Sequence, residues 1–375
     1  MSTKTSLLLS TYIIDGVTQE LTPAAILDAV SEMSPAAGDE IPARIVDESL
    51  EPEVSPAEWI AEEIDVYLNA VLQKLGEERE VPLIFADSYT RFRIATTLLD
   101  FLWRMGSFRI GDVSLEAQWR WNIDEVGAAS AFYSSVQAAG EFLDALGVSL
   151  RSYDAKAGFP ACSMRFIPGL RGSVDEESLV ERPYTTPSPK LGAASLPSSL
   201  LPDESSWIVY IPFDSSAYRM GGSLFAQAMK FARPVAPQVN DADYFQDCFE
   251  VVRELVEDGI IIAASTVGDG GLLATLKAMT TPRTGAEIDL SDLKKATAEE
   301  DIVRLLFAEV PGALIQVRDA DFDYIDAELL LQDVAFYPLG HPVAGGNIRV
   351  KSSAKSGIQN ILDALARRQG GEGED

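Results

Sequence analysis

The chain has 375 residues, and its 58 acidic against 30 basic side chains give a formal net charge of −28 at pH 7. A surface this negative repels phosphate backbones and anionic lipid, so we expect neither nucleic acid nor a membrane surface as a partner. The length fits two domains, and no apolar run reaches the roughly 18–20 residues that span a bilayer. We therefore expect a cytoplasmic protein with reduced thiols.

Few residues are available for two common kinds of chemistry. With two cysteines and one histidine, the chain cannot assemble a Cys/His zinc site. A hydrolase triad would have to use His341, which lies in a Pro- and Gly-rich stretch that we expect to be a solvent-facing loop. Cys162 and Cys248 lie far apart in the sequence, and we expect both to be small hydrophobic residues of the core.

Residues 1–80 form an acidic lead-in with one amphipathic helix. Tyr12–Ile14 is strand-like and ends at an Asp-Gly turn, and residues 32–58 have the Pro, Ala and acid content of a solvated linker. Ser55 is a candidate N-cap for a helix whose apolar stripe runs from Trp59 to Leu75. We interpret that stripe as a core or docking surface.

A first domain is predicted over residues 81–200. The patterns indicate a strand at 81–85, a helix at 94–105, a strand at 110–121 and a helix at 132–146. The segment 169–205 is rich in Ser, Pro and Gly, and we place the domain boundary within it.

A second domain is predicted over residues 205–350, followed by a helix and a disordered tail over 351–375. Strands are expected at 207–211, 260–264, 313–317 and 334–337, and helices at 245–256, 272–279, 302–307 and 324–331. Because strands and helices alternate along the chain, the predicted fold class is α/β or α+β.

The turn at residues 268–271 is the sharpest local candidate for a site. Glycines after a buried strand let backbone N–H groups approach an anion, and the following helix N-terminus adds partial positive charge. Asp269 in this turn is suited to bind Mg²⁺ through oxygen, or else to cap the helix.

Several sequence blocks occur in the order of a known family. The three main blocks are a Gly-Gly-Ser stretch at 220–227, an Asp-Gly-Gly turn with its helix at 267–276, and a Leu-Phe-x-Glu block at 305–312. Two shorter matches lie at 287–290 and 337–340, and two upstream segments lie at 115–119 and 145–147. Over roughly residues 85–350 the chain resembles the second half of phosphoribosylformylglycinamidine synthase, the glutamine-dependent enzyme of purine synthesis, in the aminoimidazole ribonucleotide (AIR) synthetase superfamily.

The resemblance implies a fold, a set of site residues and a partner. The fold is two α/β domains: a strand-rich N-terminal domain that pairs into a dimer barrel, and an α+β C-terminal domain. The partner is a second copy or a heteromeric synthetase-like chain, and the cofactors are Mg²⁺ and ATP or ADP. The residues that match the family's cofactor and metal positions are Asp154, Gly221, Gly222, Gly270 and Gly271 for the nucleotide, and Asp269 and Glu309 for the metal.

The chain departs from the family where phosphate chemistry is done. A His-Asp pair is replaced by Ser265-Thr266, and a serine of the turn is Gly268. The family's Gly-Lys-Asp-Ser segment falls at residues 152–155, where only Asp154 remains, and its Asn is Gln118. Neither the first synthetase-like half nor the glutaminase domain is found in these residues, so we expect no ammonia source here.

Three hypotheses follow. The favoured one is a non-catalytic relative that keeps the fold for assembly or protein interaction, because losing Lys and His-Asp together removes most of the charge stabilisation of phosphoryl transfer. The second is an ATP-dependent ligase that amidates formylglycinamide ribonucleotide, completed by partner subunits. The third is a module that binds a nucleotide without turnover. The last two need basic residues at the phosphates, and the candidates are Arg151, Lys156, Arg165 and Arg219.

Overall fold

The computed structural model describes residues 6–31, 40–43, 64–75, 79–106, 108–171, 195–230 and 235–351. The predicted helix start at Ser55 and the C-terminal tail lie outside these ranges. Of the linker predicted over residues 32–58, only 40–43 lie within them, and they form a short strand instead. None of the helices within them has the length and apolarity that crossing a bilayer requires.

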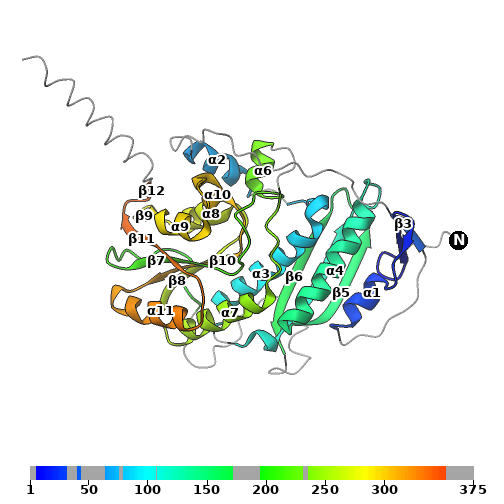
Figure 1. The fold of residues 1–375 in the computed structure, drawn as a ribbon, viewed down its shortest axis with the longest axis horizontal. Helices are drawn as coiled ribbons and strands as arrows, with labels where there is room; N and C mark the ends of the chain where they lie inside the picture. The colour runs from blue at the N-terminus through cyan, green and yellow to red at the C-terminus, as the bar shows by residue number, and fades with distance from the viewer. Residues whose placement is uncertain are drawn as a thin grey trace, which may run out of the picture.

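A three-stranded sheet forms the middle of the molecule. Its order is β5-β4-β6, with β4 (Val113–Trp121) parallel to β5 (Ser149–Ala157) and antiparallel to β6 (Ser163–Leu170). Alternate residues of β4 are buried, and they pack under α3 (Ala86–Met105) and α4 (Ala128–Leu146) on one face of the sheet (Figure 1). The intervening residues carry the polar side chains to the other face.

A six-stranded sheet forms the C-terminal part, in the order β12-β9-β11-β7-β10-β8. All neighbours are antiparallel except β12 and β9. The strands are β7 (Trp207–Pro212), β8 (Ile261–Val267), β9 (Thr284–Asp289), β10 (Gly312–Val317), β11 (Tyr337–Ala344) and β12 (Ile348–Lys351).

Helices cover both faces of this sheet, and its strands are buried accordingly. Ile208 and Tyr210 of β7 point into one apolar core, and Val209 and Ile211 point into the other. The first core is closed by α8 (Gly271–Met279), α9 (Ser291–Thr297) and α10 (Ile302–Phe307), and the second by α7 (Ala242–Glu257) and α11 (Asp319–Leu331) (Figure 1). A short helix, α6 (Leu224–Met229), follows the Gly-Gly-Ser turn.

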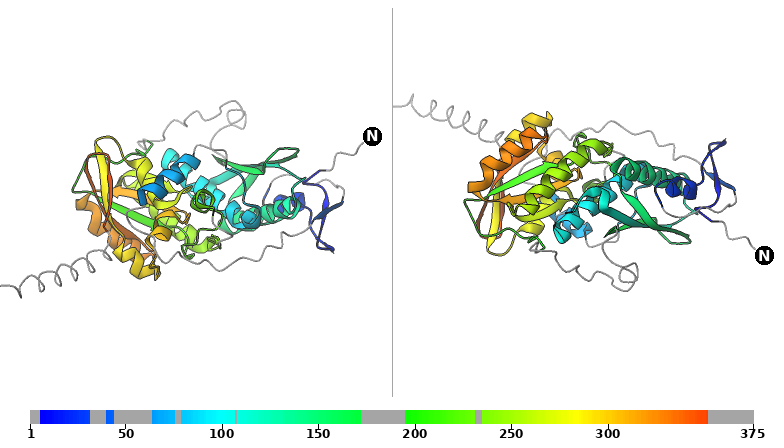
Figure 2. Two further views of the ribbon diagram at one scale, coloured as in Figure 1. Left: turned by 90° about the horizontal axis from the view of Figure 1, so that it is seen from above. Right: turned by 90° about the horizontal axis from the view of Figure 1, so that it is seen from below.

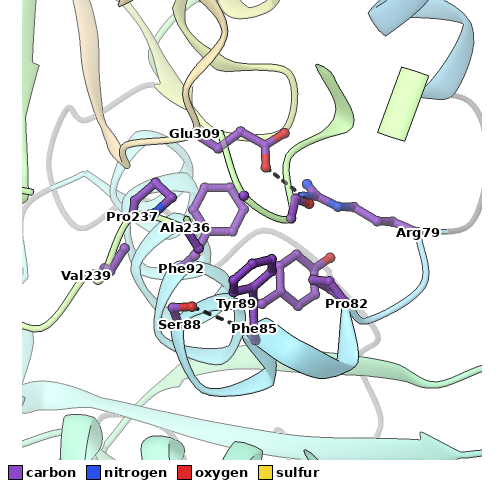
Figure 3. Close-up of a pocket in the computed structure, with 12 residues that line it drawn as sticks. Arg79, Pro82, Phe85, Ser88, Tyr89, Phe92, Ala236, Pro237, Val239 and Glu309 are labelled. Carbon is purple, nitrogen blue, oxygen red and sulfur yellow. Dashed lines mark hydrogen bonds and ion pairs between the residues drawn. The ribbon is translucent and has the colours of Figure 1, made fainter. Parts of the chain in front are cut away.

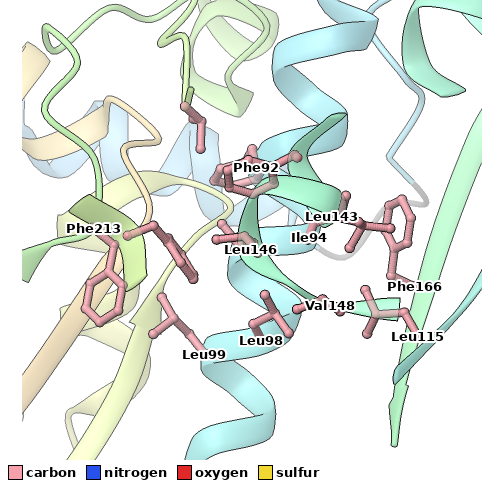
Figure 4. Packing of buried hydrophobic residues seen from close by; sticks show 14 of the residues in the cluster. Phe92, Ile94, Leu98, Leu99, Leu115, Leu143, Leu146, Val148, Phe166 and Phe213 are labelled. Atoms are coloured by element: carbon pink, nitrogen blue, oxygen red, sulfur yellow. The ribbon is translucent and has the colours of Figure 1, made fainter. Parts of the chain in front are cut away.

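The second core is continuous with the core of the three-stranded sheet. Leu98 and Leu99 of α3 lie between Leu115 of the three-stranded sheet and Phe213 after β7 (Figure 4). Helix α3 therefore packs against both sheets.

The N-terminal residues form a small unit on the outer side of α4. Its sheet has the order β2-β1-β3, from β1 (Thr11–Ile14), β2 (Val17–Thr18) and β3 (Glu40–Ala43), and its helix is α1 (Pro23–Asp28). The Tyr153 hydroxyl of β5 donates to Asp28 at 2.7 Å. Figure 2 places this unit at the end of the molecule opposite α11. Helix α2 (Ile64–Lys74) packs instead near α6 and α8.

The expected fold class is confirmed, and several local predictions are wrong. Residues 83–85 form a 3-10 turn that leads into α3, so the strand predicted at 81–85 is absent and the helix begins eight residues before 94. Strand β11 starts at Tyr337, whereas the sequence predicted a strand over 334–337. Strand β6 ends at Leu170, inside the segment 169–205 in which we placed the domain boundary. His341 lies within β11 and is not a loop residue, and its ring packs against Trp207 with ring centroids 4.1 Å apart.

Candidate functional site

Two glycine turns meet at one buried carboxylate. Gly222 and Gly270 have φ angles of +72° and +82°, which glycine adopts without strain. Glu309 lies between α10 and β10, and its Oε1 accepts from the backbone N–H of Leu224 at 3.0 Å and of Gly270 at 2.8 Å. The Gly270 N–H, one of the turn donors that the sequence suggested for an anionic ligand, is therefore occupied by a side chain of the protein itself.

Arg79 completes this cluster. Its guanidinium donates to Glu309 Oε2 at 2.6 Å (Figure 3) and to the Gly222 carbonyl at 2.7 Å. It also donates to Asp269. The guanidinium carbon also lies 4.7 Å from the centroid of the Tyr89 ring, within the range of a cation–π contact. The Arg79 side chain is only 8% exposed, so it is buried in the protein interior.

Asp269 is held by a second arginine. Arg93 of α3 donates to Asp269 Oδ2 at 3.1 Å. The first residue before α8 is Gly270, and no side chain caps that helix, so the alternative prediction that Asp269 caps it is wrong. Both predicted metal-binding carboxylates are thus paired with arginine.

Burial and charge act in opposite directions on this cluster. Burial raises the pKa of the Glu309 carboxyl above its usual value, while the adjacent Arg79 and the bond from Leu224 N–H lower it. Burial lowers the pKa of Arg79, but Glu309, Tyr89 and Asp269 raise it more, so the net pKa is above that of an ordinary arginine. Arg79 therefore remains a cation at any physiological pH.

A small cavity adjoins the arginine. It has a volume of about 20 Å³ and is bordered by Arg79, Tyr89, Gly221, Gly222 and Glu309 among others (Figure 3). The Arg79 Nε finds no acceptor among the described residues. A space of this size holds a single water molecule, which would satisfy that donor.

A larger cleft also borders Arg79 and Asp269. Its volume is about 370 Å³, and it is lined by Arg79, Tyr89, Arg93, Gln118, Arg120, Ser163, Met164, Arg165 and Asp269. Gln118 and Arg120 are on β4, and Arg165 and Ser163 face them on β6 in register. The cleft is thus bordered by residues of β4, β6 and α3 and by the Asp-Gly-Gly turn.

The remaining predicted residues lie elsewhere or act structurally. Asp154 is on β5, where its half-exposed carboxylate pairs with Lys156 at 2.9 Å, and it does not line the cleft. Arg151 pairs with Glu116 at 3.8 Å. At Gly271, with φ +74°, a Cβ would lie 2.8 Å from the Phe307 carbonyl carbon, so this turn needs a residue without a side chain.

The donor set does not favour a bound metal ion. Over the ranges that the structure describes, no group of three or more His, Cys, Asp or Glu residues could hold one. Asp269 and Glu309 converge on one point, but the guanidinium of Arg79 stands there and supplies the positive charge. The present residues therefore do not fit Mg²⁺ without displacement of Arg79.

Arg79 and Arg93 were not among the sequence candidates. Arg79 follows two glutamates in an acidic run, and Arg93 occupies a helix with ordinary charged neighbours, so both have the pattern of surface residues. The sequence holds one usable signal: with so few basic residues, each arginine near the family's blocks merits inspection.

Comparison with known proteins identifies the relatives. The family profile described as AIR synthase related protein, C-terminal domain, matches residues 215–352. Human phosphoribosylformylglycinamidine synthase is 23% identical over 286 residues, which is 76% of this chain. Residues 215–352 thus match an AIR synthase related domain, and the chain is similar to phosphoribosylformylglycinamidine synthase. The resemblance carried by the sequence blocks is confirmed.

Solved structures show the same fold at lower identity. PurL from Thermotoga maritima complexed with FGAR has a TM-score of 0.53 and 11% identity, covering 73% of this chain and 42% of that one. PurLQS from Thermotoga maritima has a TM-score of 0.52 and 14% identity, covering 72% and 40%. The AIR synthase-like chain spans 20% of the human enzyme's length. The whole enzyme's activity is therefore a matter for proposal.

Proposed function

We propose that this AIR synthase-like chain performs no ATP chemistry and keeps the fold for assembly with a second synthetase-like chain, either another copy or a heteromeric partner. The observation that carries the proposal is the contact of Arg79 with both Asp269 and Glu309. A fixed cation at the point where two carboxylates converge removes their capacity to hold Mg²⁺ and nucleotide.

The backbone supports the same conclusion. Phosphoryl transfer relies on donors aimed at the phosphates and on metal-held charge. Here the Gly270 and Leu224 N–H groups donate to Glu309. Donors and carboxylates of the site therefore satisfy one another, and a nucleotide would have to compete with buried ion pairs.

The three-stranded sheet offers a surface for assembly. Strands β5 and β6 are its two edges, and the side chains of Asp154 and Lys156 on β5 are 54% and 68% exposed. An open edge presents unpaired backbone groups that a second chain can pair with. The relatives' dimer barrel, implied by the resemblance, would use this sheet.

Turnover tests the catalytic half of the proposal. Phosphate release is measured with the full chain, Mg·ATP, formylglycinamide ribonucleotide and ammonium, and we expect none above the protein-free rate. Turnover that falls by about 10²–10³-fold in Asp269→Asn, and not in the exposed control Asp292→Asn, would instead establish the alternative of an ATP-dependent ligase.

Light scattering tests the assembly half. We expect the mass of a dimer at micromolar concentration for the chain alone. Ile167→Lys, on the outer face of β6, should yield a monomer, while Val126→Lys at an 80% exposed position away from the sheet edge should not. A monomer at all concentrations would contradict the homodimer.

A further inference from the structure

Helix α11 carries apolar residues on two opposite faces. Ile325 and Leu329 are buried and belong to the core that α11 closes. A second stripe recurs on the opposite side at spacings of four, three and four residues, and all its members are exposed: Ala320, Tyr324, Ala327 and Leu331. Leu331 is 75% exposed. A surface helix ordinarily presents polar residues on that side, so this outer α11 stripe has the pattern of a contact surface.

Carboxylates lie beside the outer α11 stripe. The negative charges of Glu328 and, from α7, Asp258 and Glu254 raise the pKa of the Tyr324 hydroxyl, which places all three beside that ring. Arg253 pairs with Glu254 at 3.0 Å, so Glu328 and Asp258 supply the excess negative charge. An occupant that matches this surface has an apolar face and basic side chains.

The sequence after β12 contains such a segment. Residues 352–369 hold three basic side chains against one acidic one, in a chain whose net charge is −28: Lys355, Arg367, Arg368 and Asp363. Four apolar residues recur at the i, i+3, i+4 and i+7 positions of an amphipathic helix: Ile358, Ile361, Leu362 and Leu365. The two arginines follow at the C-terminal end of the pattern, where cations favour a helix.

The end of β12 lies close enough to α11 for this segment to reach it. Lys351 pairs with Glu287 at 2.6 Å, and Glu287 lies opposite His341 in register. His341 packs on Trp207 of β7, and Trp207 packs on Phe322 of α11 with ring centroids 4.8 Å apart. Strand β12 is three strands from β7, which is about 15 Å at the usual strand spacing. Six further residues of chain span up to about 20 Å.

We propose that residues 358–368 dock as an amphipathic helix on the outer α11 stripe of their own chain. The apolar residues of the segment would cover the stripe, and Arg367 and Arg368 would lie against the carboxylates of α7 and α11. Ala320 and Ala327 leave room for a second helix to approach closely. A helix of this length is marginal in water by itself, so docking would be what orders it.

The short connection favours this occupant over a second copy. A segment joined by six residues meets the stripe at a high effective concentration, whereas a copy from another chain must compete with it. The inference does not rest on the assembly proposal, which concerns the edges of the three-stranded sheet.

Hydrogen exchange on the full chain, read by mass spectrometry, tests the docking. We expect the amides of residues 358–368 to exchange about tenfold or more slowly than those of an unstructured peptide, because docked helices open rarely. The protection should not change with protein concentration. Exchange at the unstructured rate would overturn the proposal. Protection that is lost on dilution would overturn it too, because the segment would then dock on a second copy.

Matched variants locate the docking surface. Leu331→Glu places a charge in the stripe and should abolish the protection, whereas Val126→Glu, at an 80% exposed position outside α11, should leave it unchanged. Replacing both Arg367 and Arg368 with Glu should reduce the protection by about fivefold or more, since two favourable charge contacts become repulsive. Protection that survives Leu331→Glu or the double variant, or that is lost equally in Val126→Glu, would refute the inference. Near-UV circular dichroism confirms that each variant is folded.

Discussion

At the scale of single residues, the contacts of Arg79 distinguish the candidate site of this chain from a site that binds a metal ion. Its guanidinium satisfies two carboxylates and one carbonyl in a nearly closed space. Removing one partner of a buried ion pair leaves the other charge unpaired, which typically costs about 3–5 kcal/mol. Arg79→Met should therefore lower the free energy of unfolding by about that amount, measured by urea denaturation.

Two further variants make that measurement specific. Arg91→Met removes a surface pair with Asp87 at 3.7 Å and should cost about 1 kcal/mol or less. Asp269 keeps its pair with Arg93 in Arg79→Met. Adding Glu309→Gln to Arg79→Met removes the carboxylate charge that is left unpaired, and should recover part of the loss. An Arg79→Met protein as stable as the Arg91→Met control would show that the buried cluster contributes little.

The two cysteines make a second prediction at the residue scale. Cys162 is 3% exposed and Cys248 is fully buried, and burial raises their pKa values to about 11 and about 12. Both thiols remain protonated at pH 8, so Ellman's reagent should label neither in the native protein and both after unfolding. Rapid labelling of the native chain at pH 8 would contradict this.

The raised pKa values of the two thiols make the free energy of unfolding depend on pH. A thiol whose folded pKa lies above the unfolded value near 8.5 contributes stability below that pH and loses it as the pH rises through the folded pKa. Stability should therefore fall between about pH 9 and pH 11, and Cys248→Ala should reduce the slope of that fall. Urea midpoints measured across this range test the sign.

At the scale of elements, the Asp-Gly-Gly turn depends on close approach as well as on its dihedral angles. Gly271→Ala would place a methyl group 2.8–2.9 Å from backbone atoms of residues 306–308, at φ +74°. Gly147, at the end of α4, has φ +65°, and a methyl group added there would have nothing within 4 Å, so Gly147→Ala should cost only the backbone penalty of about 1–2 kcal/mol. Gly271→Ala should cost about 1–3 kcal/mol more, through overpacking. Equal urea midpoints for the two variants would contradict the role of backbone approach.

At the scale of the whole molecule, α3 couples the two sheets. One apolar core includes residues of α3, β4 and β5 together with Val209, Ala264 and Ile315 of the six-stranded sheet. A shared core predicts one cooperative unfolding transition in place of two separate ones. Far-UV and near-UV circular dichroism should give coincident melting curves, and Leu98→Ala should shift both together. Two resolved transitions would show that the sheets unfold independently.

Many local features of the fold could be predicted from the sequence. The turn at Asp15-Gly16, the helix ends at Gly106 and Gly147 and the alternating burial of β4 all agree with the structure. Each of these depends on the dihedral preferences of one residue or on the periodicity of near neighbours. The errors fall where a local pattern is ambiguous, as in the apolar residues 81–85, which form a turn and not a strand.

The sequence by itself determined the resemblance to the AIR synthetase superfamily, most of the order of the elements and the glycine turns around the candidate site, because these follow from short motifs and periodicity. Only the tertiary structure decided what occupies that site. Arg79 lies 190 residues from Asp269 and 230 from Glu309, and no local pattern connects them. Whether the arginine meets the two carboxylates depends on how α3 and both sheets pack. That packing buries all three groups, and buried charges must be paired.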